Sequence, residues 1–326
     1  MLLMTPKDTE EEESTEIKEY DLGIIGIGPA GLTASLYAAR ANVSVVCIGR
    51  DYGGQMGLAL EIENYPGFEN ISGIELTDKM REQAEKFGTR IVYGEVSTIE
   101  KTEDNKFFIR SDMGNYIAKS LILATGGRHK ELEVPGEKDF IGRGVSYCAT
   151  CDAAFFKEKT VIVAGSGDAA ATGTLALSDV GAKKIYWVSR SEYLKCERIY
   201  VDRAEQRDNI EILYHKQVSE IKGTNTVEEV LFNDGTSLKV DGIFAEIGTI
   251  PNTELAIELG CEIEDDLIKI DDDCKTSIPG IFAAGDVTSK IKNPLSRQIT
   301  TSVGLATIAA IATAEYLQAR KTIKKD

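Results

Sequence analysis

The chain has 326 residues, of which 42% are hydrophobic and 28% are charged, and its formal net charge is −16. This length is enough for two domains that each bury a hydrophobic core, and the composition is that of a globular protein. The acidic balance argues against a nucleic-acid partner, because binding to phosphates requires clustered Lys and Arg side chains.

Residues 1–19 are predicted to form an acidic, disordered tail. Their only apolar run is residues 1–4, and glutamates occupy positions 10–13. Such a run is too short for the core of a signal peptide, and its acidic flank is unlike that of a transit peptide. The longest apolar stretch, residues 303–314, is too short to cross a membrane. We therefore expect a cytoplasmic protein without a membrane partner.

A first dinucleotide-binding unit is predicted near the N-terminus. An apolar strand at 21–25 leads into Gly26-Ile27-Gly28-Pro29-Ala30-Gly31, and a helix at 32–40 and a strand at 43–48 follow. In this G-x-G-x-x-G motif the first glycine makes the tight turn and the second lets a pyrophosphate approach the backbone. The third glycine lets the helix pack closely, so that its first amides face the phosphates.

Two cysteines separated by two residues, Cys148 and Cys151, form the most distinctive motif, and Asp152 follows them. Such a pair can close into a small, reducible disulfide. Half a zinc site is the alternative, but there is no second C-x-x-C, and His129 and His215 are isolated in the sequence. We therefore expect a redox disulfide and no metal site.

A second unit of the dinucleotide-binding type follows the redox pair. A strand at 160–164 leads into Gly165-Ser166-Gly167-Asp168-Ala169-Ala170, and a helix and a strand at 184–188 come next. Two such units predict two dinucleotide sites, or one working site and one fold without a ligand.

Two further strands are predicted to end against a cofactor. The strand at 121–126 ends in Thr125-Gly126, and the segment 277–287 ends in a strand followed by Gly285-Asp286. A carboxylate just past a strand end can accept a hydrogen bond from a ribityl or ribose hydroxyl. The order of these pieces indicates one domain interrupted by another. The predicted fold class is α/β, with two Rossmann-like three-layer domains, the second inserted into the first.

With these pieces the chain resembles the low-molecular-weight thioredoxin reductases, flavoproteins of the pyridine nucleotide–disulfide oxidoreductase superfamily, from about Tyr20 to Tyr316. The position of the C-x-x-C in the second domain matches this group. The other markers are Gly53-Gly54-Gln55, Glu63-Asn64-Tyr65-Pro66-Gly67, Gly285-Asp286-Val287 and Arg297-Gln298.

The resemblance implies a homodimer and a discontinuous FAD domain, residues 20–127 and 252–326. Residues 128–251 would be inserted as a pyridine-nucleotide-type domain that carries the disulfide. This domain would rotate about two connecting strands, near residues 126–127 and 248–252. The residues implied to contact FAD are Gly26, Gly28, Pro29, Ala30, Gly31, Gly54, Gln55, Asn64, Thr125, Gly126, Gly285, Asp286, Arg297 and Gln298.

The implied activity is that of a thioredoxin-disulfide reductase. FAD would pass two electrons to the Cys148–Cys151 disulfide, which would reduce thioredoxin or a thioredoxin-like protein by thiol–disulfide exchange. In the family pattern Cys151 faces the flavin, Cys148 attacks the partner and Asp152 is the acid. Two alternatives are a non-catalytic FAD-binding redox sensor and the reductase component of a peroxiredoxin system.

The electron donor is the point where the chain departs from this family. NADPH-dependent members have a His-Arg-Arg…Arg pattern for the 2′-phosphate, whereas this chain has Ser189-Arg190-Ser191 and Lys195. Losing one charge-assisted contact costs about 1.5–3 kcal/mol. Three alternatives remain: NADH with Glu192 on the ribose, weakened NADPH use, or a silent site with a donor such as reduced ferredoxin. The candidate nicotinamide site comprises Gly165, Gly167, Asp168, Ala169, Arg190, Glu192 and Lys195.

Overall fold

Both ends of the described chain contribute to a seven-stranded sheet with the order β3-β2-β1-β6-β5-β4, in which β19 also pairs with β6. The structure is a computed structural model, and it describes residues 17–59, 62–291 and 296–323. The strands of this first sheet are β1 (Lys18–Ile25), β2 (Val45–Gly49), β3 (Arg90–Tyr93), β4 (Val96–Lys101), β5 (Phe107–Ser111), β6 (Gly114–Leu123) and β19 (Ile281–Ala283).

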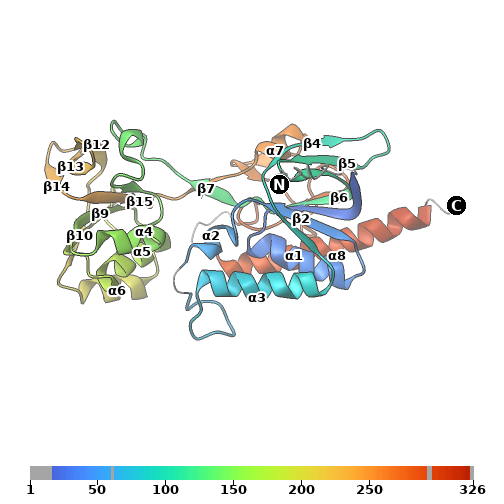
Figure 1. The fold of residues 1–326 in the computed structure, drawn as a ribbon, viewed down its shortest axis with the longest axis horizontal. Coiled ribbons are helices and arrows are strands. Elements are labelled where there is room, and N and C mark those ends of the chain that lie inside the picture. Colours follow the sequence, from blue (N-terminus) through green and yellow to red (C-terminus); the bar gives the residue numbers. More distant parts are fainter. Residues whose placement is uncertain (1–16, 60–61, 292–295, 324–326) are drawn as a thin grey trace, which may run out of the picture.

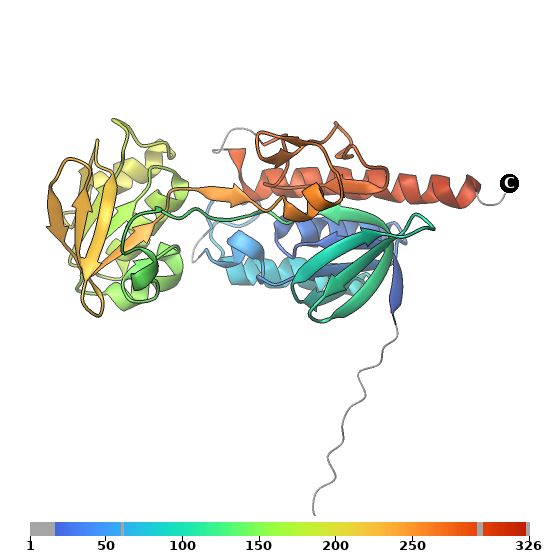
Figure 2. The same cartoon turned by 90° about the horizontal axis from the view of Figure 1, so that it is seen from above.

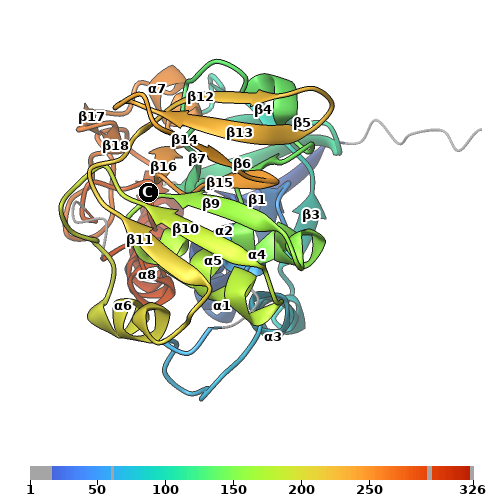
Figure 3. The ribbon, with the colours of Figure 1, turned by 90° about the vertical axis from the view of Figure 1, so that its left-hand side faces the viewer.

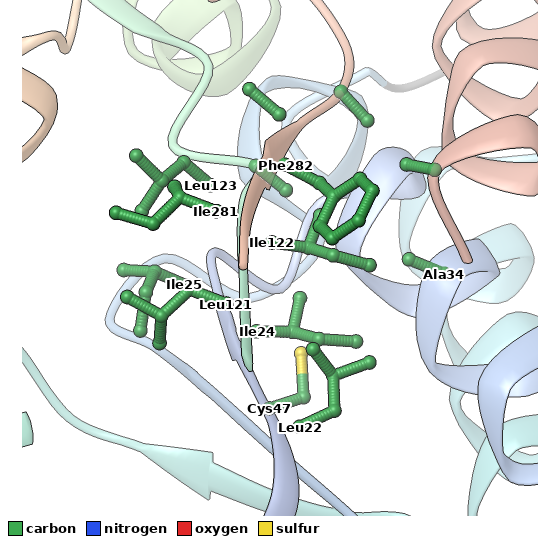
Figure 4. Close-up of a cluster of buried hydrophobic side chains, with 14 of the residues drawn as sticks. Leu22, Ile24, Ile25, Ala34, Cys47, Leu121, Ile122, Leu123, Ile281 and Phe282 are labelled. Carbon is green, nitrogen blue, oxygen red and sulfur yellow. The ribbon is translucent and has the colours of Figure 1, made fainter. Parts of the chain in front are cut away.

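Parallel pairing in this sheet joins segments that are far apart in the sequence. Ile281 pairs with Leu121, so the C-terminal part returns beside β6. Figure 4 shows Leu121, Ile122 and Ile281 among the buried side chains of this core, next to Ile24 and Phe282. The predicted interruption of one unit by another is therefore visible in the strand order.

Three helices cover one face of the first sheet and lie together below it in Figure 1. They are α1 (Pro29–Arg40), α3 (Gly73–Lys86) and α8 (Ile299–Ile323), and two short helices, α2 (Gly54–Gly57) and α7 (Glu254–Glu258), lie at the edges. The close packing of α1 depends on Gly31, because a Cβ there would lie 1.8 Å from the Gly26 carbonyl oxygen.

The second unit is built around a five-stranded parallel sheet with the order β11-β10-β9-β15-β8. Figure 3 shows its helices on one side and a three-stranded antiparallel sheet on the other. Its elements are β8 (Val145–Ser146), α4 (Ala149–Asp152), β9 (Thr160–Ala164), α5 (Asp168–Asp179), β10 (Lys184–Val188), α6 (Arg198–Glu205), β11 (Ile210–Leu213), β12 (Val218–Gly223), β13 (Val227–Phe232), β14 (Ser237–Lys239) and β15 (Gly242–Ala245), with 3₁₀ turns at Lys138–Phe140 and Ala153–Phe156. The predicted fold class, two Rossmann-like α/β units, is confirmed.

The two units are joined by a pair of antiparallel strands, β7 (Gly127–His129) and β16 (Thr249–Pro251). Figure 2 shows this pair running between them. Gly126 and Gly248 flank the pair with positive φ angles of 58° and 111°, a conformation that favours glycine. These glycines lie within the segments predicted as hinges, 126–127 and 248–252, and rotation about them stays a prediction. A small hairpin, β17 (Ile263–Glu264) and β18 (Leu267–Ile268), completes the described strands.

Two expectations from the sequence need correction. Strand β1 begins at Lys18 and pairs with Tyr116, so the predicted tail 1–19 is too long by at least two residues; residues 1–16 lie outside the described part. The second expectation took 303–314 as the longest apolar stretch, too short to cross a membrane, whereas helix α8 extends from Ile299 to Ile323. By length and composition alone, residues Ile299–Thr322 of this helix could cross a membrane. In the structure α8 packs on α1, with Ala306 and Ala309 fully buried.

Candidate active site

A cleft of about 2490 Å³ lies between the two units and is lined by both glycine loops. The carboxyl ends of the parallel strands of each sheet open toward it, as expected for sites of α/β folds. Each residue implied to contact FAD lines this cleft, except Gly31, which packs beneath the first loop. Among the candidate nicotinamide residues, Gly165, Gly167, Asp168, Ala169, Arg190 and Lys195 line it as well.

The first glycine loop forms a backbone cradle with the turn at Gly53 and Gly54. Both of these glycines have positive φ angles, 73° and 56°. A Cβ on Gly54 would lie 3.2 Å from the Gly28 Cα, so the two backbones touch. Gln55 is held in the same region, because its Nε2 donates to the Gly127 carbonyl over 3.1 Å. This arrangement exposes unhindered backbone of the kind that binds a pyrophosphate.

The Gly285-Asp286 turn places a carboxylate in the cleft. The Ser302 hydroxyl donates to Asp286 over 3.1 Å, and burial raises the pKa of Asp286 above its usual value. A buried carboxyl group with a raised pKa that faces a cleft is a candidate for a functional residue.

Arg297 supplies a buried donor without a partner. Its Nη1 donates to the Thr249 hydroxyl over 3.2 Å, whereas its Nε is buried and has no hydrogen-bond partner in the described structure. An unpaired buried donor is costly unless a ligand accepts from it. The backbone cradle and this donor together fit an anionic flavin nucleotide.

Thr125 has a role that the sequence did not indicate. Its hydroxyl donates to the Asn252 carbonyl over 2.6 Å, and the Asn252 Nδ2 donates back to the Thr125 carbonyl over 3.0 Å. These bonds tie together the two ends of the connecting strands, so the Thr125 side chain serves this junction.

The redox motif lies on the wall of the second unit. Cys148 is disulfide-bonded and lines the cleft, whereas the thiols of Cys47, Cys196, Cys261 and Cys274 are free. The Cys148 amide donates to the Ser146 hydroxyl over 3.1 Å. The side chain of Cys151 lies outside the described part. Asp152 ends α4, is partly buried and does not line the cleft.

Two glutamates near this motif were missed at the sequence level. Glu137, only 1% exposed, accepts from the Tyr147 hydroxyl over 3.0 Å and from the amides of Leu132 and Glu133 over 2.7 Å each. Glu246 accepts from the Ala149 amide over 2.9 Å. A carboxyl group directly after the buried strand 242–245 was a signal that could have been read for Glu246. Nothing local indicates Glu137.

The second glycine loop carries an acidic side chain at the start of α5. Asp168 accepts from the Glu197 amide over 2.9 Å and from the Gln298 Nε2 over 3.4 Å. The Lys195 amide donates to the Ser166 carbonyl over 2.6 Å, so the segment after β10 lies directly on the loop. The Gln298 contact crosses from one unit to the other.

The remaining predicted residues of this site separate into two groups. Arg190 and Lys195 line the cleft, whereas Glu192 is exposed and does not.

Asn64 donates from its Nδ2 to the Gln298 Oε1 over 3.1 Å, which brings together two residues implied to contact FAD. Within residues 17–59, 62–291 and 296–323, no group of three or more His, Cys, Asp or Glu side chains could hold a metal ion.

The family model described as pyridine nucleotide-disulphide oxidoreductase matches residues 20–311. A thioredoxin reductase of Bacillus subtilis is 39% identical over 311 residues, which cover 93% of this chain and 96% of that protein.

Two solved structures are similar over almost their whole length. Lactococcus lactis thioredoxin reductase in its FR conformation has a TM-score of 0.87 at 39% identity and covers 92% of this chain and 99% of its own. Thioredoxin reductase from Streptococcus pyogenes has a TM-score of 0.60 at 41% identity, and the match covers 93% of this chain and 100% of that chain.

Proposed function

This chain belongs to the thioredoxin reductases of the pyridine nucleotide–disulphide oxidoreductase family, and we propose that it reduces the disulfide of thioredoxin or of a small thioredoxin-like protein. The observation that carries this proposal is the disulfide-bonded Cys148 in the same cleft as the glycine loop that begins at Gly26. A reduced cofactor held in this cradle would lie in the same cleft as the disulfide and could pass electrons to it.

We propose FAD as the resident cofactor. The first glycine loop would hold its pyrophosphate, Asp286 a hydroxyl of its sugar chain, and the unpaired Nε of Arg297 one of its acceptor atoms. A bound flavin would supply the two electrons that open the disulfide.

The disulfide partner of Cys148 is proposed to be Cys151. The sequence has six cysteines, and Cys47, Cys196, Cys261 and Cys274 are free. After reduction, the Cys148 thiolate would attack one sulfur of the partner's disulfide and form a mixed disulfide, releasing the other sulfur as a thiolate. The Cys151 thiolate would then displace the partner, which leaves with both of its sulfurs reduced. Asp152 remains the proposed acid that protonates a leaving thiolate.

The domain division is also a proposal: residues 20–127 and 252–326 as the FAD domain, and 128–251 as the inserted domain, which changes its orientation. Two relatives of nearly equal identity and coverage support it, because their TM-scores of 0.87 and 0.60 differ widely. Similar sequences with the same parts in different relative positions give such a difference.

We further propose a cytoplasmic homodimer, which sedimentation of the pure protein and cell fractionation would test.

For the electron donor we propose that NADH is excluded. Glu192, the residue expected to bind the ribose of NADH, is exposed and does not line the cleft. The Asp168 carboxylate beside the second glycine loop would repel the pyrophosphate of NADH and of NADPH alike, so it weakens both without distinguishing them. Arg190 and Lys195 still line the cleft, so weakened NADPH use and a non-nicotinamide donor are the two candidates.

Anaerobic titration of the bound flavin with NADPH, NADH and reduced ferredoxin tests this. A Ser191→Arg variant restores the missing cation, and Glu192→Gln is the matched control. Weak NADPH use predicts that Ser191→Arg tightens NADPH binding by about 10-fold or more, because one charge-assisted contact returns. If the affinity for NADPH is the same in Ser191→Arg and wild type, the result favours a non-nicotinamide donor. Flavin reduction by NADH as effective as by NADPH would contradict the proposal.

The same preparations test the function itself. Purified protein should carry the visible absorbance of a flavin and turn over with thioredoxin. A flavin that is reduced and reoxidised without thiol formation in thioredoxin would instead indicate the redox sensor. Turnover with a peroxiredoxin but not with thioredoxin would indicate the peroxiredoxin system.

A further inference from the structure

Glu246 lies at the carboxyl end of β15, whose four residues are all buried. This strand lies between β9 and β8 in the second sheet, and β8 leads into the redox motif. The Glu246 Oε1 accepts a hydrogen bond from the Ala149 amide over 2.9 Å. The amide that it binds belongs to the residue directly after Cys148.

The surrounding packing holds this contact in place. Ala149 is fully buried, and a Cβ added to Gly173 of α5 would lie 2.5 Å from the Ala149 Cβ. The same added Cβ would lie 3.9 Å from the Glu246 carboxylate. Helix α5 therefore needs glycine at this point so that Ala149 at the start of α4 can fit against it, and the Glu246 carboxyl group lies at ordinary contact distance from the same place.

Among the described residues, no opposite charge lowers the pKa of the Glu246 carboxyl group. Burial raises its pKa from the ordinary value of 4.5 to about 7, and the hydrogen bond from Ala149 opposes this rise only in part. Strands β8 and β9 carry no titratable side chain. Helix α5 carries Asp168 and Asp179 at its ends and α4 carries Asp152, but none of these three shifts the pKa of Glu246.

We propose that Glu246 is a positioning residue for the redox disulfide: it holds the chain after Cys148 in place, and its negative charge limits thiolate formation at Cys148 in the reduced protein. The proposal rests on the disulfide reductase function. Opening the disulfide breaks the S–S bond and places two electrons on the sulfurs. Two protons are taken up when both end as thiols and one when a thiolate remains. A nearby carboxylate disfavours the thiolate by like-charge repulsion.

The test measures the pH profile of Cys148 alkylation. The full-length protein is reduced chemically, pulsed with iodoacetamide at a series of pH values, and the modified Cys148 peptide is quantified by mass spectrometry. Wild type is compared with Glu246→Gln, which keeps an acceptor for the Ala149 amide but no charge, and with Glu246→Ala, which removes both. Glu211→Gln is the control, because Glu211 is an exposed carboxylate on β11, three strands from β15.

We expect the thiol pKa of Cys148 to fall by about one unit in Glu246→Gln, because the repelling charge is gone. The Glu211→Gln profile should match wild type. Turnover should be retained in Glu246→Gln and reduced in Glu246→Ala, since only the latter releases the Ala149 amide.

Coincident alkylation profiles of wild type and Glu246→Gln would overturn the charge effect, and full turnover of Glu246→Ala would overturn the positioning role. Alkylation of reduced protein needs neither an electron donor nor thioredoxin. A protein that fails to reduce thioredoxin but shows the expected shift would therefore contradict the proposed function alone.

Discussion

Some functional residues of this chain could be assigned from a local sequence pattern. Others could not, because their place in the site depends on contacts with distant segments. Gly26 and Gly54 could be assigned from the sequence, because a tight turn with a positive φ angle favours glycine. The contact of Glu246 with Ala149 could not be assigned, because the two residues are 97 positions apart, although the strand end before Glu246 was a local signal. The sequence likewise did not show that the Asp168 carboxylate is occupied by the Glu197 amide.

A stability prediction follows from the burial of Glu246. The pKa of its carboxyl group is raised in the folded state to about 7, from 4.5. Below pH 4.5 this group therefore does not change the free energy of unfolding. As the pH rises from 4.5 toward 7, the charged carboxylate is disfavoured in the folded state and the free energy of unfolding falls. The loss is at most about 3 kcal/mol, and partial exposure of the side chain reduces it.

Urea unfolding of wild type and Glu246→Gln at about pH 5 and about pH 8 measures this effect. The variant should be more stable than wild type at the higher pH, with a much smaller difference at the lower pH. An equal difference at both pH values would contradict the raised pKa.

At the level of elements, the strands and helices around the glycine motifs could be predicted, because periodicity and the motif agree there. The extent of β1 could not, because its first residues become strand through pairing with β6. The sheet of β12, β13 and β14 was also not predicted. Its strands lie in a polar, charged segment. The buried residues Val218 and Ile221 of β12 are three positions apart, because the pairing with β13 shifts register between Val218 and Glu220, so the two-residue period of a strand is lost.

The packing of α1 on the first sheet gives a testable prediction. A Cβ at position 31 would lie 1.8 Å from the Gly26 carbonyl oxygen, which belongs to the backbone and cannot move aside. Gly31→Ala should therefore lower the free energy of unfolding by about 1–3 kcal/mol and weaken flavin binding. Gly304→Ala on α8 is the matched control, because nothing lies within 4 Å of its added Cβ.

The control should stabilise the protein by up to about 1 kcal/mol, because alanine favours the helix. Denaturant unfolding and flavin absorbance after dialysis report both effects. Equal stability of Gly31→Ala and wild type would show that the loop and helix can separate, contrary to the account of the cradle.

The relative orientation of the two units is the property of the whole molecule that the sequence could not show. It depends on contacts between segments that have no common local pattern. Arg203 of α6 pairs with Glu63 over 2.8 Å, and Gln298 reaches Asp168 over 3.4 Å. Both contacts cross from one unit to the other and would break if the inserted unit rotated.

Removing the Arg203–Glu63 pair should shift the orientation modestly. Its side chains are 42% and 46% exposed, so we expect about 0.5 kcal/mol, or roughly a twofold change in populations. Small-angle X-ray scattering of Arg203→Ala, at low and high salt, measures this shift. Arg198→Ala is the control, since Arg198 pairs with Asp202 and Glu205 within α6. Identical scattering of wild type and Arg203→Ala would exclude a role for this pair.

Delivery of electrons from Cys148 to a protein disulfide can be measured in a single turnover. The protein is reduced chemically without oxygen, freed of reductant and mixed with oxidised thioredoxin, and new thiols in thioredoxin are counted. We predict about two thiols per chain from the Cys148–Cys151 dithiol, and up to about two more where the bound flavin is also reduced, for wild type and for Cys196→Ser alike; Cys148→Ser should give none. Thioredoxin that stays oxidised with the wild-type protein, or becomes reduced with Cys148→Ser, would contradict the account.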